Sequence, residues 1–196
     1  YKGEAPNWEQ RHTGRKTERD PEASDFSPGR FTTPNGWSVE STEYVNNNDI
    51  NQRLSILSKK YTSGDGSDVV FTQSSAGRII GTVVTIKGKD LGIQGLANAK
   101  GNSVLMPGSD MTVPEDYTLV LSAATTPSVG SNAQPADTVS VFPTNTHTLL
   151  SPWSTKGNRL GVAAAWGRNQ GDTVTAPIFV IDGVQDDWTT TTFMVR

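Results

Sequence analysis

Runs of Val, Ile, Thr and aromatic residues, separated by turns that contain Gly, Pro or Asn, constrain this chain most. Branched and aromatic side chains favour extended backbone, because they fit a pleated sheet better than a helix. The clearest runs are DVVFTQ, GRIIGTVVTIKG, YTLVLSAAT, TVSVFP, RLGVAAAWGR, TVTAPIFVIDGV and WTTTTFMVR. We therefore predict an all-β, antiparallel β-sandwich of about eight strands, jelly-roll-like, over residues 31–196.

One of these runs, residues 78–88, is predicted to be a central strand. Alternate side chains of a strand point to opposite faces, and here both faces are fairly apolar. Ile80, Thr82, Val84 and Ile86 share one face, and Ile79, Gly81, Val83 and Thr85 share the other. Such a pattern is typical of a strand that is covered on both sides.

The other segments give weaker predictions. Pro34-Asn35-Gly36 lies between β-formers and predicts a hairpin. Residues 43–63 predict either a short helix that begins at Asn48 or Asp49, or a loop and a strand. Residues 88–116 are rich in Gly and Pro and predict short strands or loops, and residues 125–137 predict a long surface loop.

Residues 1–30 differ in composition from the rest of the chain. They hold six basic and six acidic residues, whose charges cancel, and few apolar ones. Such a tract buries too little apolar surface to offset its chain entropy, so we expect an extended polar arm. Its own domain or a neighbouring subunit would hold it, and the second arrangement is a common way to fasten repeated subunits. The residues expected to make these contacts are Trp8, Arg11, Arg15 and Arg19.

Composition also excludes several classes of function. The chain has no cysteine, which excludes disulfides, thiolate zinc sites and thiol nucleophiles. A net charge of −3 argues against nucleic-acid binding by this segment. The apolar runs are too short for a membrane-spanning helix. Because the chain begins with Tyr1 and not Met, we expect a processed product or part of a longer protein.

No catalytic constellation stands out. The two histidines, His12 and His147, lie far apart in the sequence and have neither a serine elbow nor metal-ligand spacing around them. No phosphate-binding or dinucleotide loop is present, and we predict no cofactor and no enzymatic activity. A hydrolase whose carboxylates come together from distant loops is kept as a third alternative.

Carboxylates and tryptophans supply the candidate ligand sites. Asp65 and Asp68 in GDGSD could offer oxygens to calcium, although the sequence equally fits a routine turn. Asp186 and Asp187 are adjacent on an expected strand end, so they should point to opposite faces and not form a glycosidase pair. DGVQDDW is expected to be a polar turn whose Trp188 packs on the sandwich edge. Trp153, in a Pro-marked loop, is the best candidate for stacking on a sugar, with Trp188 as a second.

In composition and sequence pattern, residues 31–196 resemble the jelly-roll or protruding-domain segments of coat proteins from small non-enveloped viruses. The likeness lies in the Thr-, Ser-, Val- and Asn-rich strands, the small-residue loop TTPSVGSNAQPAD, the absence of cysteine and the preceding polar arm. It implies a capsid protein in the virion that self-assembles with other copies of itself and could contact a host-cell receptor or glycan. The arm departs from the pattern because it is charge-neutral, whereas such arms are often basic. The alternative is an extracellular glycan-binding β-sandwich module or adhesin.

Overall fold

The computed structural model describes residues 31–47, 50–66, 68–73, 79–88, 90–127, 139–141, 147–155, 158–181 and 186–196. Within these ranges every regular element is a β-strand, and every pairing of strands is antiparallel. The predicted all-β antiparallel sandwich is therefore confirmed. The arm expected at residues 1–30 lies outside the described residues.

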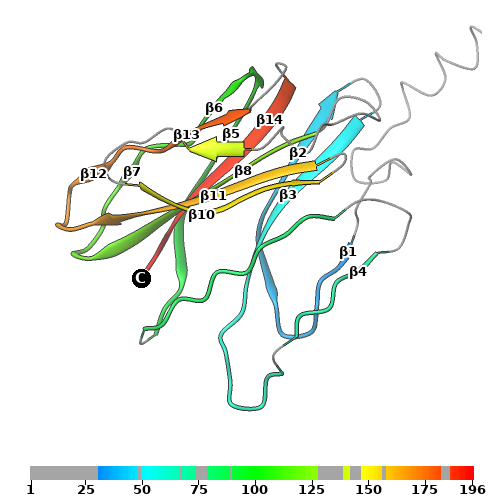
Figure 1. The fold of residues 1–196 in the computed structure, drawn as a ribbon. Helices are drawn as coiled ribbons and strands as arrows, with labels where there is room; N and C mark the ends of the chain where they lie inside the picture. The colour runs from blue at the N-terminus through cyan, green and yellow to red at the C-terminus, as the bar shows by residue number, and fades with distance from the viewer. Residues whose placement is uncertain are drawn as a thin grey trace, which may run out of the picture.

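The largest sheet has five strands in the order β10–β11–β8–β14–β5 (Figure 1). Its strands are β10 (His147–Thr155), β11 (Asn158–Gly167), β8 (Thr118–Pro127), β14 (Asp186–Val195) and β5 (Ile93–Ser103). The three inner strands carry alanines and threonines that are buried on both faces, and Thr189 to Thr192 are completely buried. Small and β-branched side chains at these positions allow other layers to approach the sheet closely from both sides.

A second sheet covers one face of the five-stranded sheet. It contains β6 (Leu105–Pro107), β13 (Ile178–Ile181) and β9 (Val139–Val141) in the order β6–β13–β9. Met106, Phe179 and Ile181 from this sheet pack with Ala163 and Trp188 of the larger one. The paired strands β7 (Met111–Thr112) and β12 (Thr173–Val174) extend this layer. The two sheets form the sandwich and together hold eight of the described strands.

The opposite face of the five-stranded sheet is covered by another pair of strands, β2 (Ser38–Asn47) and β3 (Ile50–Ser58). Leu54 of β3 packs against Ala123 of β8 and against Leu160 and Val162 of β11. The main sheet is thus a middle layer with apolar contacts on both faces. The short strands β1 (Phe31–Thr32) and β4 (Thr72–Gln73) pair with each other beside this layer (Figure 1).

Two sequence predictions near the start of the described chain need correction. The helix considered at Asn48 or Asp49 is wrong, because β2 and β3 pair antiparallel on either side of these two residues. At Pro34-Asn35-Gly36 the turn is present: the Trp37 N–H donates to the Pro34 carbonyl at 3.1 Å, and Gly36 has a φ of 79°. The hairpin prediction is nevertheless wrong, since β1 pairs with β4 and not with β2.

The predicted central strand at residues 78–88 is also wrong. Residues 79–88 form no strand, and Val83 is 62% exposed. The central positions are instead held by β8, β11 and β14, whose smaller side chains fit between two layers. The described residues of the region 88–116 form no helix, as expected, but they do include β5, which runs for 11 residues.

Candidate functional site

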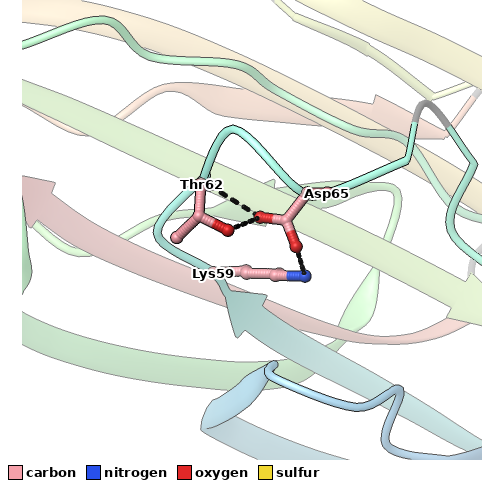
Figure 2. A network of polar contacts seen from close by, with 3 residues as sticks. All are labelled: Lys59, Thr62 and Asp65. Carbon is pink, nitrogen blue, oxygen red and sulfur yellow. Dashed lines mark hydrogen bonds and ion pairs between the residues drawn. The ribbon is translucent and has the colours of Figure 1, made fainter.

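A polar turn follows β3 and includes Asp65, one of the two calcium candidates (Figure 2). The ammonium of Lys59 lies 2.5 Å from Oδ1 of Asp65. The backbone N–H and the hydroxyl of Thr62 donate to Oδ2 of the same carboxylate, at 2.7 Å and 3.1 Å. Both carboxylate oxygens of Asp65 therefore already have partners within the turn. The Asp65 side chain stabilises the turn through these bonds.

The hydrogen bond from Lys59 and then that from the Thr62 N–H lower the pKa of Asp65 below its usual value of 3.8. Asp68, the other calcium candidate, is exposed. Among the described residues, no group of three or more His, Cys, Asp or Glu side chains is placed to hold a metal ion. The geometry at Asp65 is that of a turn held by an ion pair, and the calcium site stays a prediction.

The start of β14 carries Asp186 and Asp187, and their side chains point to opposite faces of the sheet. Asp186 is 2% exposed and accepts the Asp187 N–H at 2.8 Å. The carboxylate of Asp187 accepts instead from the side-chain amide of Asn102 on β5, at 2.5 Å. The two carboxylates therefore do not face each other as an acid and a nucleophile would.

Asp186 is the most perturbed acid in the described part of the chain. Burial raises its pKa from 3.8 to about 6, against the opposing effects of the Asp187 N–H and the positive charge of Arg159. Arg159 is itself 5% exposed, on β11. Its register partner Thr126 donates its hydroxyl to the Asp187 carbonyl at 2.7 Å. Asp186 thus belongs to a buried polar cluster with Arg159 and Thr126.

Trp188, the second sugar-binding candidate, lies within β14 and not in a turn. Its ring is 5% exposed and packs with Phe179 and Met106 in the core between the two sheets. Its Nε1 donates to the hydroxyl of Ser103 at 3.0 Å. The expectation of a turn with Trp188 on the sandwich edge is wrong here, because β14 already begins at Asp186. Residues 182–185 lie outside the described part.

The remaining candidates are scattered. Trp153 is a residue of β10, paired with Leu160, although a loop was predicted there. His147 begins the same strand opposite Ala165, and burial lowers its pKa below 6.5. The arm residues Trp8, Arg11, Arg15 and Arg19, together with His12, lie outside the described residues. The predicted site residues that the structure describes lie in three separate parts of the chain: the turn after β3, strand β10 and strand β14.

Sequence reasoning missed a different feature, which is a set of large apolar side chains left exposed. Tyr61, Val70 and Val83 are 62% to 73% exposed, and all lie between β3 and β5. Tyr117 and Trp166, at 75% and 61%, lie at one shared end of β8 and β11, where the Tyr117 N–H donates to the Arg168 carbonyl at 3.2 Å. We call these the excursion (residues 59–92) and the aromatic end (Tyr117 and Trp166). The apolar pattern of residues 78–88 was the only sequence signal for the excursion. Nothing in the sequence distinguished the aromatic end from aromatic residues that are buried.

Comparison of this chain with known protein families, with curated proteins and with solved structures finds no match. No helix in the described residues has the length and apolar character needed to cross a membrane.

Proposed function

We propose that this chain is a structural protein that self-assembles with copies of itself. Specifically, it would serve in the virion as the coat subunit of a small non-enveloped virus, or as one domain of such a subunit. The observation that carries the proposal is the exposure of large apolar side chains at two separate places, the excursion and the aromatic end. Large apolar side chains that gather on the surface of a protein are candidates for contact with a partner. Two such places suit a subunit that has more than one neighbour.

The layered core supports the same function. Burial on both faces holds the five-stranded sheet rigid, so that its shape can be repeated without change in every copy. Among the described strands, β10 and β5 each have a ladder partner on one side only. Leu149 and Leu150 on β10 are 37% and 43% exposed. Open edges with apolar side chains offer backbone groups and apolar area for contact between subunits.

The test is the native mass of the full chain over a range of concentrations, measured by light scattering after size separation. Particles of many copies are expected. Deleting residues 1–30 should leave the sandwich folded by circular dichroism and abolish the particles. Replacing the aromatic end by Tyr117→Ser with Trp166→Ser should reduce assembly without loss of fold, because both side chains are already exposed. A chain that stays monomeric at every concentration contradicts the proposal.

A second candidate function is glycan binding, and the aromatic end favours it. An exposed indole and an exposed phenol at the same end of β8 and β11 offer apolar ring faces together with polar groups, which proteins use to stack on sugar rings. Glycan arrays with the native chain, with Trp166→Ala and with Trp153→Ala test this function. Binding that Trp166→Ala abolishes would support an adhesin. An array with no bound glycan would remove this candidate.

A further inference from the structure

Residues 79–88 are extended and belong to none of the sheets. No backbone hydrogen bond joins this segment to any described part of the chain. In Figure 1 it runs as a single path outside the sheets before it enters β5. Its N–H and carbonyl groups can therefore bond to a molecule that binds the segment in extended form, and no bond within the described chain has to break first.

The chain's own core holds this segment at two isoleucines. Ile80 packs against the core cluster that contains Leu54, and Ile86 packs against the one that contains Phe193. The five residues between them, Gly81 to Thr85, are all exposed. A Cβ at Gly81 would meet nothing within 4 Å. The middle of the segment is thus accessible, while the core holds it on both sides.

An accessible, extended segment of this kind is what an endoprotease binds. Such an enzyme aligns its substrate as an extended strand, bonds to the backbone and cuts one peptide bond, and nicking concentrates where the chain is exposed. Val83 is 62% exposed and lies at the centre of the five exposed residues. A serine protease with a small apolar S1 pocket accepts a side chain of this size beside the bond that it cuts.

We propose that the peptide bond between Val83 and Val84 is a processing site, which an elastase-like serine protease cuts in the folded chain. The protease serine attacks the Val83 carbonyl carbon, and Val84 leaves as an amine. Water then displaces the serine, so that Val83 ends in a carboxylate and Val84 begins with an ammonium. The fragments 1–83 and 84–196 stay together. This inference goes beyond the proposed function and does not depend on self-assembly.

Contacts with the main sheet hold the two fragments together after the cut. The first fragment contains β2 and β3, and Leu54 of β3 packs against Leu160 of β11 in the second fragment. The side-chain amide of Asn98 on β5 donates to the carboxylate of Glu43 on β2 at 2.6 Å. The two isoleucine anchors lie on opposite sides of the cut. Each new chain end therefore stays attached to the core.

The other exposed aliphatic residues of the described chain are poorer sites. Val104 is 37% exposed, but its carbonyl accepts the Ile181 N–H at 2.9 Å. Val70, at 73%, is the strongest competitor, yet β4 begins two residues later. Ile79 lies directly beside the anchored Ile80. The rest belong to strands, whose ladder bonds would have to break before a protease could bind them: Val39, Leu105, Leu149, Leu150 and Ile178.

Limited digestion of the full-length chain with pancreatic elastase tests the proposal. Mass spectrometry and sequencing of new N-termini should find a fragment that begins at Val84 among the first products. Under native conditions the two fragments should migrate as one species with native-like circular dichroism. A parallel series in low urea distinguishes a cut in the folded chain, whose rate changes little, from a cut that requires global unfolding, whose rate rises steeply with urea.

Val84→Pro and Val84→Ala form a matched pair of variants. Proline directly after the bond prevents the cut, and at residue 84 it removes an N–H that bonds to nothing in the described chain. It also restricts Val83 to the extended conformation that this residue already has. Val84→Ala shortens the same side chain, keeps the N–H and should be cut like the native chain. Both variants should keep native-like circular dichroism.

The outcomes separate the inference from the proposed function. An early fragment that begins at Val84 and is lost in Val84→Pro alone supports the processing site. A first cut after Val70, a rate at Val83 that follows global unfolding, or fragments that separate after the cut would each overturn it. A chain that assembles but is not cut at Val83 overturns the processing site and leaves self-assembly intact. A chain that is monomeric and is cut there does the reverse.

Discussion

Trp188 on β14 lies directly across the ladder from Gly101 on β5, and its indole occupies the space where a side chain at position 101 would begin. A Cβ at Gly101 would stand 2.6 Å from Cζ2 of the ring. The same indole fills the core with Phe179 and Ile181 and bonds to Ser103. Trp188 can therefore be buried at this end of the sandwich only because residue 101 is a glycine.

Gly101→Ala should consequently destabilise the fold by about 1–3 kcal/mol, because the added methyl group overpacks a core that has no room to relax cheaply. Urea unfolding followed by tryptophan fluorescence measures the change. Gly92→Ala is the matched control, since a Cβ there meets nothing within 4 Å. Equal midpoints for the two variants would contradict the stated role of Gly101.

The strands that the sequence predicted best are those whose local pattern agrees with their place in the fold. β8, β11 and β14 are rich in Val, Thr and Ala, and each lies inside the main sheet. The sequence did not predict β5 as one long strand, because Gly95, Asn98 and Gly101 are poor strand formers. Gly101 and Asn98 occupy these positions because of contacts with other strands. Gly101 makes room for Trp188, and the amide of Asn98 donates to Glu43 on β2 at 2.6 Å. No local pattern carries that information.

The candidate site residues show the same difference between features that local sequence predicts and features that depend on the rest of the fold. The opposite directions of Asp186 and Asp187 followed from strand geometry alone and are confirmed. Which tryptophans are exposed could not be predicted, because Trp166 and Trp188 both lie on strands, and only the neighbouring layers decide that one is exposed and the other buried. Residues 79–88 had the pattern of a covered strand, and the single chain supplies only part of that cover.

Thr191 provides a test of the buried threonines on β14. Its hydroxyl is buried and has no hydrogen-bond partner among the described residues, whereas that of Thr190 donates to the Pro107 carbonyl at 2.9 Å. Thr191→Val should raise the free energy of unfolding by about 1 kcal/mol, because it removes an unpaired buried polar group at constant shape. Thr190→Val should lower it by a similar amount. Chemical denaturation of both variants checks the two signs, and a loss of stability in Thr191→Val would contradict the assignment.

The turn at Asp65 makes a prediction for titration. NMR should find the pKa of Asp65 below 3.8, since Lys59 and Thr62 stabilise the charged form. The ionised Asp65 therefore stabilises the folded chain at pH values above its pKa in the unfolded chain. This stabilisation is lost as the pH falls through the lower pKa that Asp65 has in the folded chain. Lys59→Met should raise the Asp65 pKa toward 3.8. Lys60→Met, which removes an ammonium 3.6 Å from Asp90, should leave it unchanged.

Asp186 makes the opposite prediction, because burial raises its pKa to about 6. At about pH 5 the folded chain binds a proton that the unfolded chain has mostly released, so the stabilising effect of that proton is full below about pH 4 and is lost as the pH rises through 6. Asp186→Asn cannot ionise and keeps an oxygen for the Asp187 N–H. It should raise the free energy of unfolding by about 2 kcal/mol above neutral pH and flatten its pH dependence between the two pKa values.

Urea unfolding of Asp186→Asn and of the native chain, at several pH values from about 4 to 8, measures this difference. The stability difference between Asp186→Asn and the native chain should increase as the pH rises. Parallel profiles for the native chain and Asp186→Asn would mean that the buried carboxyl does not titrate with folding. In that case the charge of Arg159, and not burial, would dominate at this end of the sheet.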